Sequence, residues 1–264
     1  MSITLKTLQK MKRAQEKIAC LTVYDASFAT LLENAGVEVL LVGDSLGMVI
    51  QGKPTTVSVT MADMIYHTRC VAGVATQALL IADMPFMSYA GVEQTLRNAA
   101  RLMQAGAQMV KLEGGQCQVE TVRHLTAQGI PVCAHLGLQP QSVHKLGGYR
   151  VQGREAAMAQ VLLADAQALQ AAGADLLVAE CIPAALAQTL QSSLDIPVIG
   201  IGAGVACDGQ ILVLYDLLGI TPHSVPRFVR NFMQDVASGS ISAAVQAYVQ
   251  AVKAQQFPAL EHSF

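Results

Sequence analysis

The sequence lacks tryptophan, any excess of charge of one sign, and any long uninterrupted apolar run. Seventeen Lys and Arg residues stand against nineteen Asp and Glu, a formal net charge of −2, which argues against the basic surface that binds nucleic acid phosphates. Asp83, Glu180 and Asp208 interrupt the longest apolar stretches before they reach the roughly 18 residues that a membrane span needs. We therefore expect a partner that is a small molecule rather than a nucleic acid or a membrane.

The six cysteines are scattered, and no two of them form a Cys-x-x-Cys pair. This spacing suggests neither a zinc site nor a disulfide framework, so most of the cysteines, Cys133 and Cys181 among them, are expected to be buried thiols. The first residues, MSITLKTLQKMKRAQEK, resemble an amphipathic helix and lack the apolar core of a signal peptide. We therefore expect a cytoplasmic protein with a helix at residues 4–17.

Short apolar runs recur along the chain, with stretches of helical character between them. Hydrophobic residues make up 52% of the sequence and charged residues 14%, which supplies ample apolar side chain for one buried core. Parallel strands that helices cover on both faces have this continuous apolar character. The expected strands are residues 19–24, 37–43, 78–83, 108–113, 130–136, 175–180 and 197–202, with a weaker eighth run at 210–216.

These units predict an α/β protein of the (β/α)8 TIM barrel class. We expect a single domain over residues 1–264, in which residues 1–18 form an N-terminal helical extension. The alternative is a doubly wound open sheet, which is disfavoured because no G-x-G-x-x-G follows the first strand. The N-terminal helix is expected either to contact another subunit or to pack across the floor of its own barrel.

Polar and charged side chains gather at the ends of the predicted strands. In a barrel, the carboxyl ends of all strands surround one mouth, so residues far apart in sequence meet there. Charges buried without partners are costly, so this group requires a compensating ligand. In chain order the residues are Asp44, Ser45, Asp83, Lys111, Glu113, His135 and Glu180.

Three of these residues, Asp44, Asp83 and Glu113, carry the hard oxygen ligands that suit Mg2+. A divalent cation would neutralise most of the charge that they bring together. Each carboxylate alone could instead pair with Lys111 or cap a helix, but helix caps would not require all three to end central strands. The sequence therefore predicts a magnesium site at the barrel mouth.

Lys111 and Glu113 are two residues apart, so their side chains face the same side of a strand. Lys111 could bind a substrate carboxylate at the mouth, and a salt bridge to a neighbouring acid is its alternative role. Ser45 could donate a hydrogen bond to the same substrate, or merely cap a helix. These two side chains are therefore candidates for binding an anionic substrate.

Glu180 ends an apolar strand, a position that suits a general base. His135 ends the preceding strand, where it could orient the substrate or shuttle a proton, with a hydrogen-bonded structural role as the alternative. The GIGAG run at residues 200–204 could form a phosphate nest, but glycine there could equally serve tight packing. Glu180 is thus the favoured candidate for proton transfer.

Several longer motifs occur in one order along nearly the whole chain, and together they resemble the ketopantoate hydroxymethyltransferase family. The joint specificity of these motifs is far above that of any one short pattern. They are LLVGDSLGMVIQG, VTMADMIYHT, ADMPFMSY, VKLEGG, CAHLGLQPQSV, GGYRVQGR and GIGAGVACDGQILV.

The resemblance implies a barrel enzyme of pantothenate and coenzyme A biosynthesis. Such enzymes move a one-carbon unit from 5,10-methylenetetrahydrofolate to 3-methyl-2-oxobutanoate, giving 2-dehydropantoate through a Mg2+-stabilised enolate. Carried over by motif, Asp44 and Asp83 would be metal ligands, and Glu113 would reach the metal directly or through water. Asp44, Ser45, Asp83 and Lys111 would bind the 2-oxo acid, and Glu180 would accept the proton. A homo-oligomer is also implied, with a decamer suggested.

Two segments depart from the family pattern. Residues 69–74, RCVAGV, lack a basic residue often found after this helix, and residues 221–228, TPHSVPRF, replace a more glycine-rich turn. These departures bear on folate contacts and subunit packing rather than on the predicted metal site. Two competing hypotheses stay open: a metal-dependent 2-oxo acid barrel of the phosphoenolpyruvate mutase and isocitrate lyase type, and a non-catalytic paralogue that binds a small acid.

Overall fold

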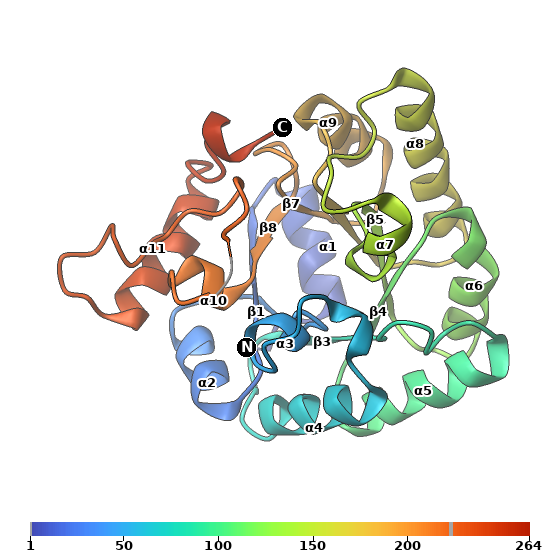
Figure 1. Cartoon of the computed structure of the whole chain (residues 1–264), viewed down its shortest axis with the longest axis horizontal. Helices are drawn as coiled ribbons and strands as arrows, with labels where there is room; N and C mark the ends of the chain where they lie inside the picture. Colours follow the sequence, from blue (N-terminus) through green and yellow to red (C-terminus); the bar gives the residue numbers. More distant parts are fainter. Residues whose placement is uncertain (1, 222–223) are drawn as a thin grey trace.

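Eight short apolar segments form a closed barrel of parallel strands in the computed structural model, which describes residues 2–221 and 224–264 (Figure 1). Each strand pairs with the next along the chain, and β1 pairs with β8 to close the ring. The strands are β1 (Ile18–Thr22), β2 (Val39–Val42), β3 (Leu79–Asp83), β4 (Met109–Glu113), β5 (Val132–Gly137), β6 (Leu176–Glu180), β7 (Val198–Ile201) and β8 (Gly209–Leu212). The predicted TIM barrel is confirmed, and the open-sheet alternative is wrong.

Helices connect the strands and surround the barrel (Figure 1). The α-helices are α1 (Leu5–Arg13), α2 (Ala26–Asn34), α3 (Leu46–Val49), α4 (Met61–Ala72), α5 (Val92–Gln104), α6 (Val119–Ala127), α7 (Val143–Leu146), α8 (Ala156–Ala171), α9 (Ala184–Ser193), α10 (Leu214–Leu217) and α11 (Ile241–Lys253). Short 3-10 turns lie at Thr56–Ser58, Gln116–Gln118, Pro140–Ser142 and Leu260–His262. In the part of the chain that the structure describes, no helix is both long enough and apolar enough to cross a membrane.

The N-terminal helix closes the floor of the barrel. Thr4 caps α1 through a reciprocal bond with Thr7, and the helix ends at Arg13 rather than at residue 17 as predicted. Leu8 and Met11 are buried in a cluster with side chains that fill the barrel interior. Of the two roles left open for this helix, the structure therefore shows packing on its own barrel.

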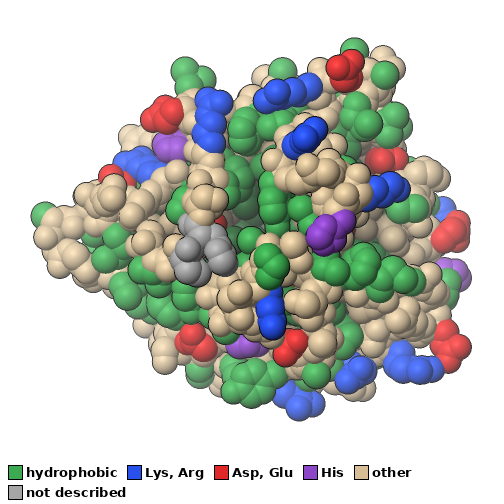
Figure 2. Space-filling model, viewed as in Figure 1, with side chains coloured by type: hydrophobic (Ala, Val, Ile, Leu, Met, Phe, Trp, Pro, Cys, Tyr) green, Lys and Arg blue, Asp and Glu red, His purple; other side chains and the backbone are tan. Residues whose placement is uncertain are grey.

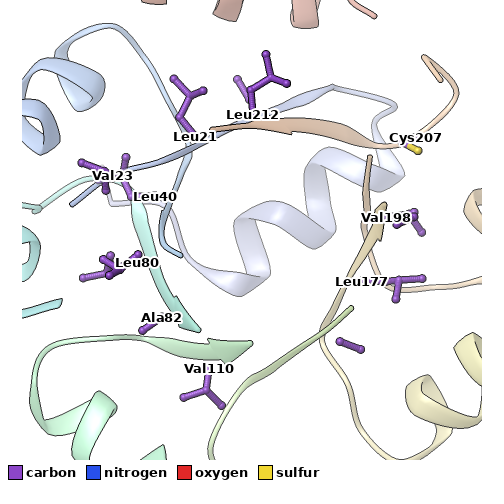
Figure 3. Close-up of a cluster of buried hydrophobic side chains, with 14 of the residues drawn as sticks. Leu21, Val23, Leu40, Leu80, Ala82, Val110, Leu177, Val198, Cys207 and Leu212 are labelled. Carbon is purple, nitrogen blue, oxygen red and sulfur yellow. The ribbon is translucent and has the colours of Figure 1, made fainter. Parts of the chain in front are cut away.

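Alternation along each strand separates two hydrophobic clusters. Residues such as Leu80, Val110 and Leu177 point away from the barrel centre toward the helices (Figure 3). Their neighbours Ile81 and Met109 belong to the inner cluster with α1. Because side chains alternate with a period of two, the last inward positions of these strands fall at the barrel mouth. Those positions are Asp83, Lys111, Glu113, His135 and Glu180.

The eighth strand is shorter than expected. β8 ends at Leu212, whereas the apolar run predicted a strand to residue 216, because residues 214–217 turn into the short helix α10. The departure noted at residues 221–228 includes Pro222 and His223, which lie outside the described residues.

Candidate active site

A cavity of about 690 Å³ opens at the carboxyl ends of the strands. Figure 2 shows the hollow in this face of the molecule, with hydrophobic side chains in its depth. The structure brings every residue of the predicted site to this one cavity, although the roles of those residues stay predictions. The residues are Asp44, Ser45, Asp83, Lys111, Glu113, His135 and Glu180.

Lys111 lies among three buried carboxylates. Its Nζ donates to Oδ1 of Asp83 at 2.7 Å, and both side chains are about 5% exposed. Burial alone would lower the pKa of Lys111, but the negative charges of Asp83, Glu113 and Asp44 outweigh burial and raise it. Lys111 is therefore a firmly protonated ammonium group within the cavity wall.

Asp44 lies just after β2, where its backbone N–H donates to Oδ2 of Asp83 at 3.0 Å. Burial, together with the charges of Asp83 and Glu113, raises the pKa of Asp44 well above its usual value. The cluster therefore contains more negative charge than Lys111 alone neutralises.

His135 lies between the carboxylates of Glu113 and Glu180. Its Nδ1 lies 3.4 Å from Oε1 of Glu113, and its Nε2 lies 3.1 Å from Oε2 of Glu180. Burial and Lys111 act to lower the pKa of His135, but the two carboxylates outweigh them and raise it to about 9. Glu180 thus has a polar neighbour within an otherwise apolar strand end, and its side chain stays 13% exposed to the cavity.

Ser45 does not cap a helix with its side chain, although it precedes α3. Its Oγ instead lies 2.8 Å from the hydroxyl of Tyr24, which donates to Thr22 at 2.9 Å. The capping alternative is therefore wrong, and Ser45 is fixed at the cavity by Tyr24.

Gln141, which the residue-by-residue interpretation missed, connects two of the carboxylates. Its Nε2 donates to Oδ2 of Asp44 at 2.9 Å, and its backbone N–H donates to Oε2 of Glu113 at 3.1 Å. The hydroxyl of Tyr89 donates to Oε1 of Gln141 at 2.5 Å. Gln141 stands within the motif CAHLGLQPQSV, but a glutamine in a loop carries no chemical signature of its own.

The glycines of residues 200–204 serve packing. A Cβ on Gly200 would lie 2.8 Å from Sγ of Cys207, and one on Gly204 would lie 2.7 Å from Cβ of Ala184. From this run Ile201 lines the cavity. The tight-packing alternative is thus favoured over a phosphate nest.

The acidic cluster fits a divalent cation that keeps other ligands. Within residues 2–221 and 224–264, no three Asp, Glu, His or Cys side chains stand close enough to hold a metal ion by themselves, so no complete chelate is preformed. Oε1 of Glu113 is buried and makes no hydrogen bond among the described residues, although Nδ1 of His135 lies 3.4 Å from it. Mg2+ commonly binds through one or two carboxylates and completes its shell with water or substrate oxygens, which suits this arrangement.

Comparison with known proteins identifies the family. The model described as Ketopantoate hydroxymethyltransferase matches residues 2–260. The chain belongs to this family. The 3-methyl-2-oxobutanoate hydroxymethyltransferase of Alkalilimnicola ehrlichii is 62% identical over 263 residues, which are 99% of this chain and 94% of that protein. The corresponding protein of Nitrosococcus oceani is 61% identical over 263 residues, 99% of each chain. The resemblance to the ketopantoate hydroxymethyltransferase family is thus confirmed over the full length.

Solved structures share the barrel at much lower identity. The complex of phosphonopyruvate hydrolase with oxalate and Mg++ aligns with a TM-score of 0.64 and 15% identity, covering 96% of this chain and 99% of that one. Identity at this level shows the fold alone. The competing type of 2-oxo acid barrel therefore shares the architecture, while the close relatives place this chain in the ketopantoate hydroxymethyltransferase family.

Proposed function

We propose that this protein transfers a hydroxymethyl group from 5,10-methylenetetrahydrofolate to 3-methyl-2-oxobutanoate, giving 2-dehydropantoate for pantothenate and coenzyme A biosynthesis. One observation carries the proposal: this chain belongs to the family, and five of the predicted residues converge on one cavity. These residues are Asp44, Asp83, Lys111, Glu113 and Glu180. We propose further that it works in the cytoplasm as a homo-oligomer, with a decamer suggested. Light scattering of the purified chain measures that assembly.

The deep end of the cavity suits a small anionic 2-oxo acid. Lys111 offers a buried ammonium group to the substrate carboxylate, and Ser45 offers a hydroxyl held in place by Tyr24. Asp44 and Asp83 would hold Mg2+, with Glu113 reaching it directly or through water. When bound, Mg2+ supplies Lewis-acid stabilisation of negative charge on the oxygens of the 2-oxo acid.

Glu180 is the proposed base for the C3 proton of the substrate. Its carboxylate lines the cavity and is held beside Nε2 of His135. Removing that proton leaves a nucleophilic carbon, which attacks the methylene group of an iminium form of the folate. Water then replaces the folate nitrogen on the methylene carbon, so that the C–N bond breaks, tetrahydrofolate leaves and the hydroxymethyl product is released. His135 orients Glu180 in this scheme through the contact of its Nε2 with the carboxylate.

The outer part of the cavity suits the larger folate. Its wall is mainly apolar, and two long connections supply much of it: Met48 and Pro54 come from the segment after β2, and Tyr149 and Val151 from the segment after β5. Tyr149 contacts Met48 across the opening, with its hydroxyl 3.6 Å from Sδ. A flat ring system laid against this wall would bring its one-carbon unit over the 2-oxo acid.

A turnover assay tests the proposal. Purified protein is given 3-methyl-2-oxobutanoate and methylenetetrahydrofolate, and 2-dehydropantoate is followed before EDTA, after EDTA, and after Mg2+ is restored. We expect turnover that EDTA abolishes and Mg2+ recovers. Activity on oxaloacetate or isocitrate with none on 3-methyl-2-oxobutanoate would favour the competing lyase type. No turnover of any of these acids would support a non-catalytic binding protein.

A further inference from the structure

Gln141 is a neutral donor at the centre of the acidic cluster. It lies in the 3-10 turn Pro140–Ser142, directly beyond β5, and is only 5% exposed. Its side-chain amide donates both to Oδ2 of Asp44 and to the backbone oxygen of Met84, each at 2.9 Å. The side chain therefore ties the end of β2 to the loop after β3.

The orientation of this amide is fixed by its surroundings. Tyr89 donates to Oε1 of Gln141, while Nε2 faces two oxygens that can only accept. If the amide were turned over, its oxygen would face the oxygens of Asp44 and Met84 in a buried space, which is unfavourable. The oxygens of Asp44 and Met84 therefore determine which way Gln141 points, and the hydroxyl of Tyr89 supports that orientation by donating to Oε1.

The carboxylates of Asp44, Asp83 and Glu113 each accept hydrogen bonds from the protein. Asp83 accepts from Lys111 and from the N–H of Asp44, so both of its oxygens are engaged. Gln141 engages Oδ2 of Asp44 and, through its backbone, Oε2 of Glu113. The second oxygen of Asp44 is thereby left for a ligand in the cavity, whereas Oε1 of Glu113 is buried and faces Nδ1 of His135 at 3.4 Å.

We propose that Gln141, supported by Tyr89, is a positioning residue that presents the second oxygen of Asp44 to the divalent cation that Asp44 and Asp83 would hold. This inference rests on the proposed function. A glutamine suits the task because it fixes carboxylates without neutralising them, whereas Lys or Arg in its place would compete with the cation for their charge. Residues that hold ligands in this way typically change metal affinity when they are replaced.

The experiment compares four full-length proteins: the wild type, Gln141→Met, Tyr89→Phe and Gln210→Met. Gln210 is a matched control, because it is also a buried glutamine whose amide donates to a backbone oxygen, that of Gly204, but among the described residues its amide donates to no carboxylate. Mn2+ serves as the probe, and its dissociation constant is measured by electron paramagnetic resonance. Thermal unfolding in EDTA reports stability separately.

We expect Gln141→Met to weaken Mn2+ binding by about 10- to 100-fold and Tyr89→Phe to weaken it by less. Gln210→Met should lower the unfolding temperature while Mn2+ affinity stays unchanged. Gln141→Met that folds and binds Mn2+ like the wild type would overturn the inference. Should that variant not fold, Tyr89→Phe decides in its place, and unchanged affinity again rejects the inference. Wild-type protein that binds no Mn2+ would reject the proposed function and the inference together.

Discussion

Lys111 places a buried positive charge among the carboxylates at the barrel mouth. Replacing it with an apolar residue of similar size removes this charge while most of the packing is kept. Lys111→Met keeps most of the volume but leaves Asp83 without its 2.7 Å partner. We expect the free energy of unfolding in EDTA to fall by about 3–5 kcal/mol, as when one member of a buried ion pair is lost. Urea denaturation measures it.

The exposed Lys145 on α7 provides the control, because Lys145→Met removes the same charge from the surface. Added Mg2+ should recover less stability in Lys145→Met than in Lys111→Met, since only the latter lacks the ammonium group that offsets part of the negative charge of the acidic cluster. Equal stability of the two variants in EDTA would contradict this description of Lys111.

His135 makes stability depend on pH in a defined direction. Its pKa is raised from 6.5 to about 9 in the folded protein, so the folded state binds the proton more tightly than the unfolded state. The stability that this provides is fully present below pH 6.5 and is lost as pH rises through about 9. In EDTA, the free energy of unfolding should therefore fall across this window.

His135→Gln should flatten that decline, while substitution of the exposed His124 on α6 by Gln should leave it unchanged. Chemical denaturation at several pH values between 6 and 9.5 measures the slopes. An equally steep decline in His135→Gln would show that other groups cause it.

The strand-end residues could be predicted from the sequence because period-two alternation and barrel geometry suffice to place them. Lys111, Glu113 and Glu180 lie on the inward side of strands whose ends meet by necessity. Gln141 and Tyr89 could not be predicted in this way. They come from loops, and only the packed path of those loops brings them to Asp44.

At the scale of elements, the junction of β5 and β6 depends on one glycine. Gly137 has φ of +92°, and a Cβ there would lie 2.1 Å from the backbone oxygen of Glu180. Leu138 donates to that same oxygen at 2.8 Å. Gly137→Ala should therefore separate the strand ends and cost about 2 kcal/mol or more, from backbone strain and overpacking together.

Gly129→Ala is the matched control for this substitution. Gly129 also has positive φ, +77°, but its Cβ would meet no atom within 4 Å. The Gly129→Ala protein should lose stability through backbone strain alone and keep its activity. Thermal unfolding and turnover of both variants test the expectation, and a Gly137→Ala protein as active as Gly129→Ala would contradict it.

The apolar runs predicted most of the strands well, but they did not predict where β8 ends and α10 begins. The runs that became β3, β4 and β6 are bounded by polar residues and match the structure to within one residue. At 210–216 the apolar run continues into α10, and apolar character alone cannot distinguish a buried strand from a buried short helix. The boundary is set by packing at the barrel rim.

At the scale of the whole molecule, the floor and the mouth of the barrel have separate tasks. On the floor, Nζ of Lys12 on α1 donates to Oδ2 of Asp208 at 2.7 Å, and Asp208 is 4% exposed. Lys12→Met should cost about 2 kcal/mol through the loss of a charged hydrogen bond. The Michaelis constant for the 2-oxo acid should stay unchanged, because that acid binds at the opposite end.

Lys10→Met on the exposed side of α1 serves as the control. It should change neither the free energy of unfolding nor the Michaelis constant for the 2-oxo acid. Denaturation and steady-state kinetics on the same preparations make the comparison. If Lys12→Met raised the Michaelis constant while stability held, the floor and the mouth would be coupled rather than separate.

The most direct test of the proposed chemistry is hydrogen exchange at C3 of 3-methyl-2-oxobutanoate in deuterated water with Mg2+, followed by NMR without folate. Glu180→Gln keeps the shape of the side chain beside His135 but cannot accept the proton. The wild type should exchange the C3 hydrogen, and Glu180→Gln should bind the acid yet exchange it at least about 100-fold more slowly. Exchange by Glu180→Gln at the wild-type rate would show that Glu180 is not the base.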